Sequence, residues 1–514
     1  MSASSGPVPA AAGEVRWGTA AARGVLATTI LGSGMAFLDS TIINVALPQI
    51  GRDLSASVAD LQWMLDGYML SLAALILIAG SLGDRYGRRR VFVIGVVWFG
   101  LASVLCGAAQ STGQLVAARV LQGIGGALLT PGSLAIIQSS FVRADRARAI
   151  GAWSGLGGIA GAIGPLLGGL VVQVWSWRLA FLINLPLAAL CVWLAGRYLP
   201  ESRDEQLAGT HPDVFDSALA ALGLAGLTYA LVELPVRGAD DPVLLATGLV
   251  GVLALAAFVV LQRLRRDPLV PPDMFADRTF TLANALTFVV YAALGGVMML
   301  FVMQLQVSLG YSPIAAGVAG LPITLILLLL SARSGQLAQR YGPRWFLVIG
   351  PFVIATGMLL LTRIGPGSSY LADVLPAVVV FGLGLACVVA PVTAAVLAAA
   401  EDRHAGIASG VNNAIARTGG LLAVAVLPAV AGLSGTAYMD PAALTAGFRT
   451  AMIVCAAMCA LGGVLALGIR NDVLAVPPTE PVPDHPRPGD CFHCGVEGPP
   501  THVEPTHRVG TASS

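Results

Sequence analysis

The chain has 514 residues, of which 56% are hydrophobic and only 11% are charged, and its mean hydropathy is +0.80. Soluble globular proteins of this length do not have such a composition, so we expect a polytopic membrane protein. The net charge of +1 gives no global field that would attract nucleic acid. All 29 basic residues are arginine, and without lysine the chain can form neither a Walker A phosphate-binding loop nor a Schiff base.

Apolar runs follow one another along most of the chain. A spanning helix needs about 20 apolar residues, and the sequence therefore predicts fourteen transmembrane helices. The first run is too long for a signal-peptide core, so we expect an uncleaved first helix. The expected helices are 24–48, 61–82, 91–109, 114–140, 149–174, 179–199, 214–234, 243–262, 280–306, 314–336, 345–363, 371–397, 405–432 and 446–469.

The segment from Gly80 to Arg90 places four arginines and one aspartate between two apolar runs. Arginine-rich short loops face the cytoplasm, and Gly83 and Gly87 allow the chain to reverse there. We therefore expect both termini in the cytoplasm. With this orientation most arginines lie on the cytoplasmic side, and the external loops contain four: Arg52, Arg178, Arg237 and Arg363.

Residues 335–344 form a weaker copy of the 80–90 loop, with Gln339 in the place of Asp84. Such a repeat predicts two six-helix bundles related as parallel repeats, an all-α construction known from transporters. The expected parts are a cytoplasmic N-terminal segment 1–23, an N-terminal bundle 24–200, an inserted two-helix hairpin with linkers 201–279, a C-terminal bundle 280–470, and a disordered cytoplasmic tail 471–514.

Three ionisable residues fall inside the predicted helices of the N-terminal bundle, at similar depth: Asp39, Asp66 and Arg119. Charges in the membrane are costly, so each is a functional candidate. A carboxylate that exchanges between a proton and a nearby arginine is what a proton-coupled switch needs. The alternative is a static ion pair between Asp39 and Arg119 that orients two helices.

Two of these helices resemble known motifs. The segment from Leu38 to Pro48 resembles the helix 1 signature of the fourteen-helix drug:proton antiporters in the major facilitator superfamily. The segment from Leu115 to Gly123 resembles the helix 4 motif of that superfamily, and Gly80 to Arg90 its helix 2–3 loop. The resemblance implies coupling roles for Asp39, Asn44 and Arg119, whereas Asp66 has no counterpart in these motifs.

The predicted fifth helix has one face of small residues. Such a face lets helices approach closely in lipid, which predicts helix packing. The same residues also resemble the helix 5 signature typical of antiporters, which favours export over import. They are Gly157, Gly161, Gly164, Pro165, Gly168 and Gly169.

The 80–90 loop also predicts a cytoplasmic gate. By resemblance, Asp84 would latch the two halves together in one state of the transport cycle, with arginines as its partners. A loop that only sets topology would explain the arginines but not the aspartate. The expected gate residues are Gly80, Asp84, Arg85, Gly87, Arg88 and Arg89.

The C-terminal bundle contains scattered polar residues that could line a substrate cavity, although interhelical hydrogen bonding is an equal alternative. These residues are Gln304, Gln306, Asn412, Asn413 and Arg417. In the tail, Cys491 and Cys494 lie near several histidines, but a single Cys-x-x-Cys is a weak metal signal, so we expect no metal site.

Together these features predict a transporter in the cell membrane and not an enzyme, because every histidine lies outside the predicted helices. The resemblance implies a proton-coupled antiporter that exports small lipophilic or cationic compounds, with the proton gradient as energy source and no cofactor. Its other partner is the lipid bilayer, and nucleic acid is not expected. An importer or facilitator of the same fold, or a membrane sensor acting through its tail, remains an alternative.

Overall fold

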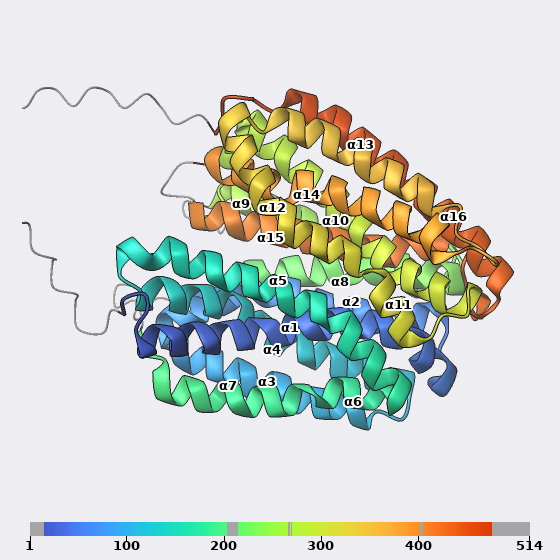
Figure 1. Cartoon of the computed structure of the whole chain (residues 1–514), viewed down its shortest axis with the longest axis horizontal. Coiled ribbons are helices and arrows are strands. Elements are labelled where there is room, and N and C mark those ends of the chain that lie inside the picture. The colour runs from blue at the N-terminus through green and yellow to red at the C-terminus, as the bar shows by residue number, and fades with distance from the viewer. Residues whose placement is uncertain (1–14, 203–213, 266–267, 269, 401–404, 475–514) are drawn as a thin grey trace, which may run out of the picture. The chain divides into compact units, whose positions relative to one another are not determined.

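The computed structural model describes residues 15–202, 214–265, 268, 270–400 and 405–474. In these ranges the regular structure is entirely helical, apart from one isolated bridge between Val15 and Phe141. Figure 1 shows the helices running side by side in one bundle. Most of the expected tail, with Cys491 and Cys494, lies outside the described residues.

The N-terminal half contains long helices joined by short turns. One interruption has a local cause: Pro186 has no N–H to offer the carbonyl of Leu182, four residues earlier, and α6 ends there. The helices are α1 (Ala20–Leu54), α2 (Val58–Tyr86), α3 (Arg88–Ala108), α4 (Thr112–Ser140), α5 (Arg143–Val174), α6 (Trp177–Leu182) and α7 (Asn184–Tyr198).

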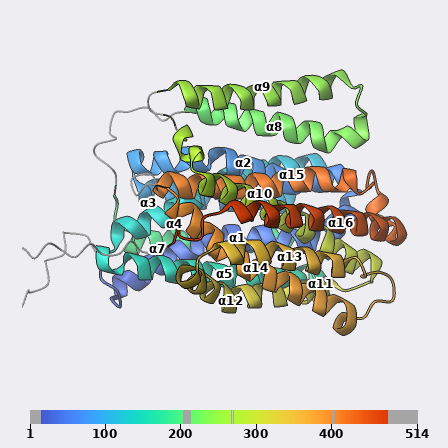
Figure 2. The same ribbon diagram turned by 90° about the horizontal axis from the view of Figure 1, so that it is seen from above.

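The expected hairpin between the halves is present as α8 (Val214–Arg237) and α9 (Pro242–Leu264), followed by the short η2 (Pro272–Ala276). The two long helices pack on each other, and α8 also packs on α2. Figure 2 shows α8 and α9 together at one edge of the bundle. Asp241 starts α9 by accepting hydrogen bonds from two backbone N–H groups, which lowers the pKa of its carboxyl.

The C-terminal half repeats the pattern of the first with more irregular turns. Its elements are α10 (Arg278–Met303), η3 (Gln304–Ser308), α11 (Pro313–Ala319), α12 (Leu321–Tyr341), α13 (Arg344–Leu361), η4 (Tyr370–Val374), α14 (Leu375–Ala398), α15 (Ala405–Val430), η6 (Ala437–Met439), α16 (Pro441–Leu465) and η7 (Ala466–Gly468).

Helices occupy all fourteen ranges in which the sequence predicts them. Within the described residues, twelve helical stretches are both long enough and apolar enough to cross a membrane. The helices α2 and α5 are not among the twelve, although they contain 29 and 32 residues. The count of fourteen spans therefore stays a prediction.

Both halves use the same packing scheme. In the first half α2 and α3 pack on α4 and α1 packs on α5, and in the second half α12 and α13 pack on α14 and α10 packs on α15. The repeated loops also match, because Gly87 and Gly342 both have positive φ, at 108° and 87°. This correspondence is what two parallel repeats produce.

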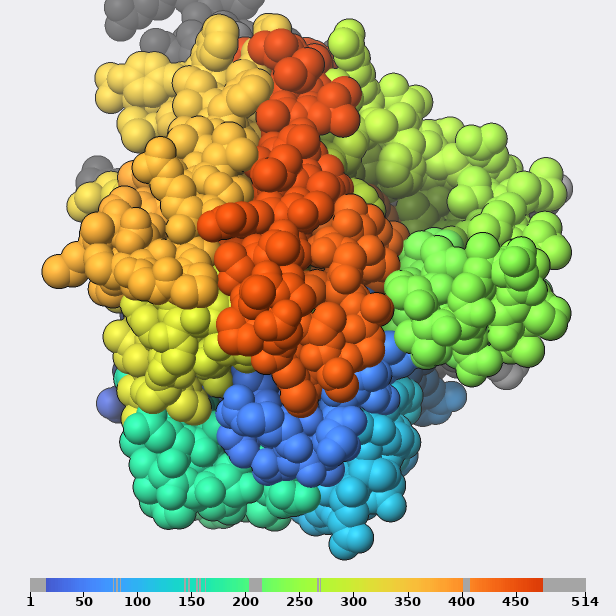
Figure 3. Space-filling model, turned by 90° about the vertical axis from the view of Figure 1, so that its right-hand side faces the viewer, coloured from blue at the N-terminus to red at the C-terminus, as the bar shows by residue number. Residues whose placement is uncertain are grey.

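The halves are joined at the end of the bundle that carries the turn between α1 and α2, which we call the α1–α2 end. There the N–H of Val58 donates to the carbonyl of Gly435 over 2.7 Å, and the Tyr438 hydroxyl donates to the carbonyl of Ala56 over 2.9 Å. Figure 3 views this end and shows the α1–α2 turn (blue) directly against the α15–α16 region (red-orange).

Candidate functional site

An ion pair is buried inside the N-terminal half. Arg119 of α4 donates from Nη1 to Oδ2 of Asp39 in α1 over 2.6 Å, and each side chain is only 1% exposed. Attraction between charges is strong at this depth because little water screens them. The structure thus brings together the aspartate and the arginine that the sequence singles out.

Arg119 also makes contacts with other helices. Its Nε donates to the carbonyl of Met64 in α2 over 3.0 Å. The guanidinium carbon lies 4.4 Å from the ring centre of Tyr68 and 5.8 Å from that of Phe181, so aromatic faces cover the cation. The arginine therefore ties α1, α2 and α4 together through one charged group.

A set of uncharged polar side chains completes the site. The second oxygen of Asp39 accepts from Gln122 Nε2 over 2.8 Å and from Asn184 Nδ2 over 3.2 Å. Both amides also donate to Ser103 Oγ, over 2.9 and 3.2 Å. We call these five residues, Asp39, Ser103, Arg119, Gln122 and Asn184, the Asp39 network.

Three members of the network were missed as site residues by the sequence analysis. A signal existed for one of them, because Gln122 follows Arg119 by three residues and so shares its helix face. Asn184 enters the site because α7 begins there, after the interruption set by Pro186. No pattern in the sequence connects Ser103 of α3 with the other members.

Among the described residues Asn44 makes no hydrogen bond to the Asp39 network, and the coupling role that the resemblance implies for it stays a prediction. Five residues along a helix correspond to about 140° of rotation from Asp39, so the two side chains point to different sides of α1. The Asn44 amide instead donates to the carbonyl of Ser40 over 3.0 Å. The amide beside Asp39 belongs to Asn184 of α7.

Asp66 of α2 is fully buried, and neither of its carboxylate oxygens has a hydrogen-bond partner among the described residues. Arg119 pairs with Asp39, which is one of the two acids that the sequence suggests as its partner. One turn before Asp66, Gln62 donates to the carbonyls of Val424 and Ala425 in α15, over 2.7 and 2.9 Å. This face of α2 therefore meets the C-terminal half.

The glycine face of α5 packs on α1. A side chain at Gly164 would collide with Thr41, and a Cβ at Gly168 would lie 3.1 Å from Ile42. Gly161 has no neighbouring atom within 4 Å of such a Cβ, and the surroundings of Gly157 lie outside the described part of the chain.

An adjacent side of α5 contacts the C-terminal half. A Cβ at Gly169 would lie 2.7 Å from atoms of Pro313 and Ile314 in α11, and Gly317 of α11 packs directly on Pro165. The small residues of α5 therefore hold α5 between α1 and the other half of the molecule, as close helix packing requires.

The turn after α2 requires glycine at Gly87. Its φ of 108° is a conformation that other residues rarely adopt, and a Cβ there would lie 2.5 Å from Oε1 of Glu201. Gly83, which was also expected in the turn, is instead helical within α2. The carboxylate of Glu201 accepts from the backbone N–H of Arg89 over 3.1 Å. The sequence analysis did not single out this acid.

The predicted latch is only partly visible. The side chain of Asp84 and the surroundings of Gly80 lie outside the described part of α2. The N–H of Arg88 donates to the carbonyl of Ser202 over 2.9 Å, and Nε and Nη1 of Arg85 are buried with no hydrogen-bond partner in the described part of the chain.

Most polar residues expected to line a C-terminal cavity form interhelical bonds, which was the alternative interpretation. Gln304 donates to Thr445 Oγ1 over 3.0 Å, and Gln306 crosses to the N-terminal half by donating to the carbonyl of Val45 over 2.9 Å. Asn412 is also bonded between helices, whereas Asn413 bonds only within α15, to the carbonyl of Ser409. Arg417 makes no such bond.

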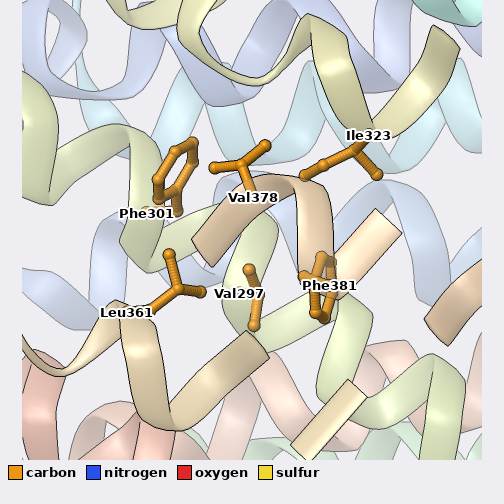
Figure 4. Close-up of a pocket in the computed structure, with 6 residues that line it drawn as sticks. All are labelled: Val297, Phe301, Ile323, Leu361, Val378 and Phe381. Carbon is orange, nitrogen blue, oxygen red and sulfur yellow. The ribbon is translucent and has the colours of Figure 1, made fainter. Parts of the chain in front are cut away.

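A pocket with an empty volume of about 160 Å³ lies within the C-terminal half. Figure 4 shows its entirely apolar lining, which consists of Val297, Phe301, Ile323, Leu361, Val378 and Phe381. These side chains offer no polar group that could orient a ligand, so the pocket is a packing defect of the core and not the candidate site.

Known proteins resemble this chain over most of its length. The family model of the Major Facilitator Superfamily matches residues 29–424. The puromycin resistance protein pur8 of Streptomyces alboniger is 36% identical over 406 residues, which are 78% of this chain and 80% of that protein. The tetracenomycin C resistance and export protein of Streptomyces glaucescens is 35% identical over 408 residues, 78% of this chain and 74% of that protein.

Among solved structures, a bacterial homolog of the human lysosomal transporter Spinster, in an inward-facing and unoccupied conformation, matches with a TM-score of 0.64. The match covers 87% of this chain and 97% of that chain at 18% identity. At this identity the likeness concerns the fold alone.

Proposed function

Because this chain belongs to the Major Facilitator Superfamily, we propose that it is a proton-coupled antiporter that exports small lipophilic molecules across the cell membrane. Family membership makes it a multi-pass membrane transporter and not an enzyme. Relatives named for antibiotic resistance and export support the outward direction of transport. The proposal includes fourteen spans, cytoplasmic termini, and the proton gradient as sole energy source.

The observation that carries the proposal is the buried pair of Asp39 and Arg119. A proton that binds Asp39 removes the negative charge, and the buried guanidinium then lacks its counter-charge. The free energy of this arrangement therefore depends on the proton, which is the property that a coupling site needs.

Asp39 lies close, along α1, to the residues through which the two halves are in contact. Thr41 and Ile42 follow it by two and three residues and pack on Gly164 and Gly168 of α5. A neighbouring side of α5 contacts α11. A small movement of α1 on protonation would thus change the contact that holds the halves together.

The contacts between the halves at the α1–α2 end indicate how access to the two sides of the membrane would alternate. If the 80–90 loop is cytoplasmic, the α1–α2 end is extracellular, and the structure is the form closed toward the outside. Substrate would then enter from the cytoplasm, and protonation from outside would follow after the halves separate at the α1–α2 end. Asp66 lies on the face of α2 that meets α15 and is a second candidate for the coupling acid.

The test is transport by the purified full-length protein in liposomes that contain a pH-sensitive dye, with puromycin and ethidium as trial substrates. We expect an imposed proton gradient to drive substrate against its concentration gradient, with proton movement in the opposite direction and with loss of transport when a protonophore is added. Substrate flow without proton movement would instead identify a facilitator, and co-directional flow an importer.

A further inference from the structure

Arg417 lies near the middle of a predicted membrane span. The apolar stretch of α15 runs from Ile407 to Val430, so Arg417 is ten residues from its start, which corresponds to a depth of about 15 Å. A charge at this depth is costly unless something compensates it.

No described residue compensates this charge. Among the described residues Arg417 forms no hydrogen bond and no ion pair, and its Nε is buried without a partner. The described titratable side chains that act on it electrostatically are two uncharged phenols, Tyr68 and Tyr291. Asp39 is engaged by Arg119, and Asp66 also lacks a partner, so neither acid pairs with Arg417.

Neighbouring amides are already engaged with other groups. Asn412, in the turn before Arg417, donates to Asn284 Oδ1 over 3.1 Å and to Thr287 Oγ1 over 2.9 Å. The guanidinium therefore remains the free hydrogen-bond donor of this region of α15, and it has five N–H groups to offer.

The two phenols that act electrostatically on Arg417 are contributed by both halves. Tyr68 belongs to α2 of the N-terminal half, and Tyr291 to α10 of the C-terminal half. A ligand that meets Arg417 at this position would contact both halves, as a substrate in an alternating-access transporter must.

We propose that Arg417 binds an acidic group of the exported molecule, so that the substrate class is lipophilic aromatic compounds carrying a carboxylate or a similar oxyanion. This inference rests on the proposed export function and narrows it. An oxyanion would supply the missing counter-charge and accept from the guanidinium in a bidentate manner, while the tyrosines would contact the aromatic part. The expectation of a cationic substrate conflicts with this unpaired arginine, because like charges repel.

Two probes of the same shape test the inference on the full-length protein in lipid nanodiscs: naphthalene-2-carboxylate, which is an anion, and naphthalene-2-carboxamide, which is neutral. For the wild type we expect the carboxylate to bind at least about tenfold more tightly, since hydrogen bonds to charged groups are the stronger ones. Arg417→Gln should weaken carboxylate binding by about tenfold or more and change amide binding by less than about twofold. Arg417→Lys should restore most of the loss.

The control variant is Arg449→Gln, which removes an exposed arginine in the third turn of α16 that donates to the carbonyl of Thr362. It should leave the binding of both probes unchanged. Equal binding of the two probes by the wild type, which needs no variant, would overturn the inference. The inference would also be overturned if Arg417→Gln loses transport and the double variant Arg417→Gln/Asp66→Asn recovers it. Arg417 would then serve as a partner of Asp66 in another state.

The measured outcomes differ according to whether the inference about Arg417 or the proposed export function is wrong. Gradient-driven ethidium export that is equal in wild type and Arg417→Gln, without carboxylate binding, would overturn only the inference. Arg417-dependent carboxylate binding without any gradient-driven export would overturn only the proton-coupled export.

Discussion

Thr41 of α1 packs directly against Gly164 of α5, two residues after Asp39. Gly169, five residues further along α5, points to another side of this helix and meets α11 of the other half. The proposed proton site and the contact between the halves are thus linked through a single short stretch of α1.

A side chain at Gly164 should disrupt this link. We expect Gly164→Val to lower gradient-driven transport by about tenfold or more, because overpacking at a helix contact costs about 1–3 kcal/mol. The matched control is Gly161→Val, one turn away on the same helix, where an added Cβ meets no atom within 4 Å. Transport that responds equally to both substitutions would show that the contact with α1 does not matter.

Gln62 should stabilise the form that is closed at the α1–α2 end. Gln62→Leu removes its hydrogen bonds to the carbonyls of Val424 and Ala425, and we expect the two halves to separate there more often. Distances between spin labels at Arg52 and Asp440 should then gain a longer component. Gln49→Leu is the control, since Gln49 bonds only to its neighbours Arg52 and Asp53. An unchanged distance distribution in Gln62→Leu would contradict the role of this bond.

Gln122 should be needed to keep the Asp39 network intact. Gln122→Leu preserves the volume of the side chain but leaves Asp39 Oδ1 and Ser103 each without one donor. We expect a loss of about 1–3 kcal/mol in stability, seen as a lower midpoint of thermal unfolding in detergent. The exposed Gln110→Leu should leave that midpoint unchanged, and equal midpoints for the two variants would argue against the network.

The sequence predicted the principal parts of the site but not its full composition. Asp39 and Arg119 were predictable because a charged residue in an apolar run stands out, and their similar depth follows from helix rise alone. Ser103 and Asn184 were not, since uncharged polar residues are common in membrane helices and only packing decides which of them meet. Asn44 belongs to the same motif as Asp39 but points to a different side of α1, so membership of a motif does not by itself give the helix face.

The contacts between the halves also could not be predicted from the sequence. The bond from Gln306 to the carbonyl of Val45 connects residues far apart in the chain through a backbone acceptor, which has no sequence signature. Glu201 was unpredictable for a similar reason. It accepts a hydrogen bond only because the chain, after the end of α7, lies next to the turn at Gly87. In contrast, the glycine turn itself was predictable, because a sharp reversal between two helices needs a residue without Cβ.

Gly87→Ala tests that turn. The alanine residue must adopt a φ of 108°, and its methyl group must displace Glu201. We therefore expect a loss of about 1–3 kcal/mol in stability. Gly113→Ala, in the first turn of α4 with open space around it, should instead be neutral or slightly stabilising. Thermal unfolding of the two variants in the same detergent compares them, and a lower midpoint for Gly113→Ala than for Gly87→Ala would contradict the account.

The most direct test of the central claim is proton-driven efflux by Asp39→Asn in inverted membrane vesicles, at a membrane level matched to the wild type. Asparagine keeps the shape of the side chain but cannot exchange a proton, and Asp240→Asn, at an exposed acid between α8 and α9, is the control. The account predicts that Asp39→Asn retains substrate binding within about threefold, loses its response to the proton gradient and no longer moves protons, while the control behaves as the wild type. Efflux by Asp39→Asn that still follows the proton gradient would contradict the account and would assign the coupling to Asp66 or to another acid.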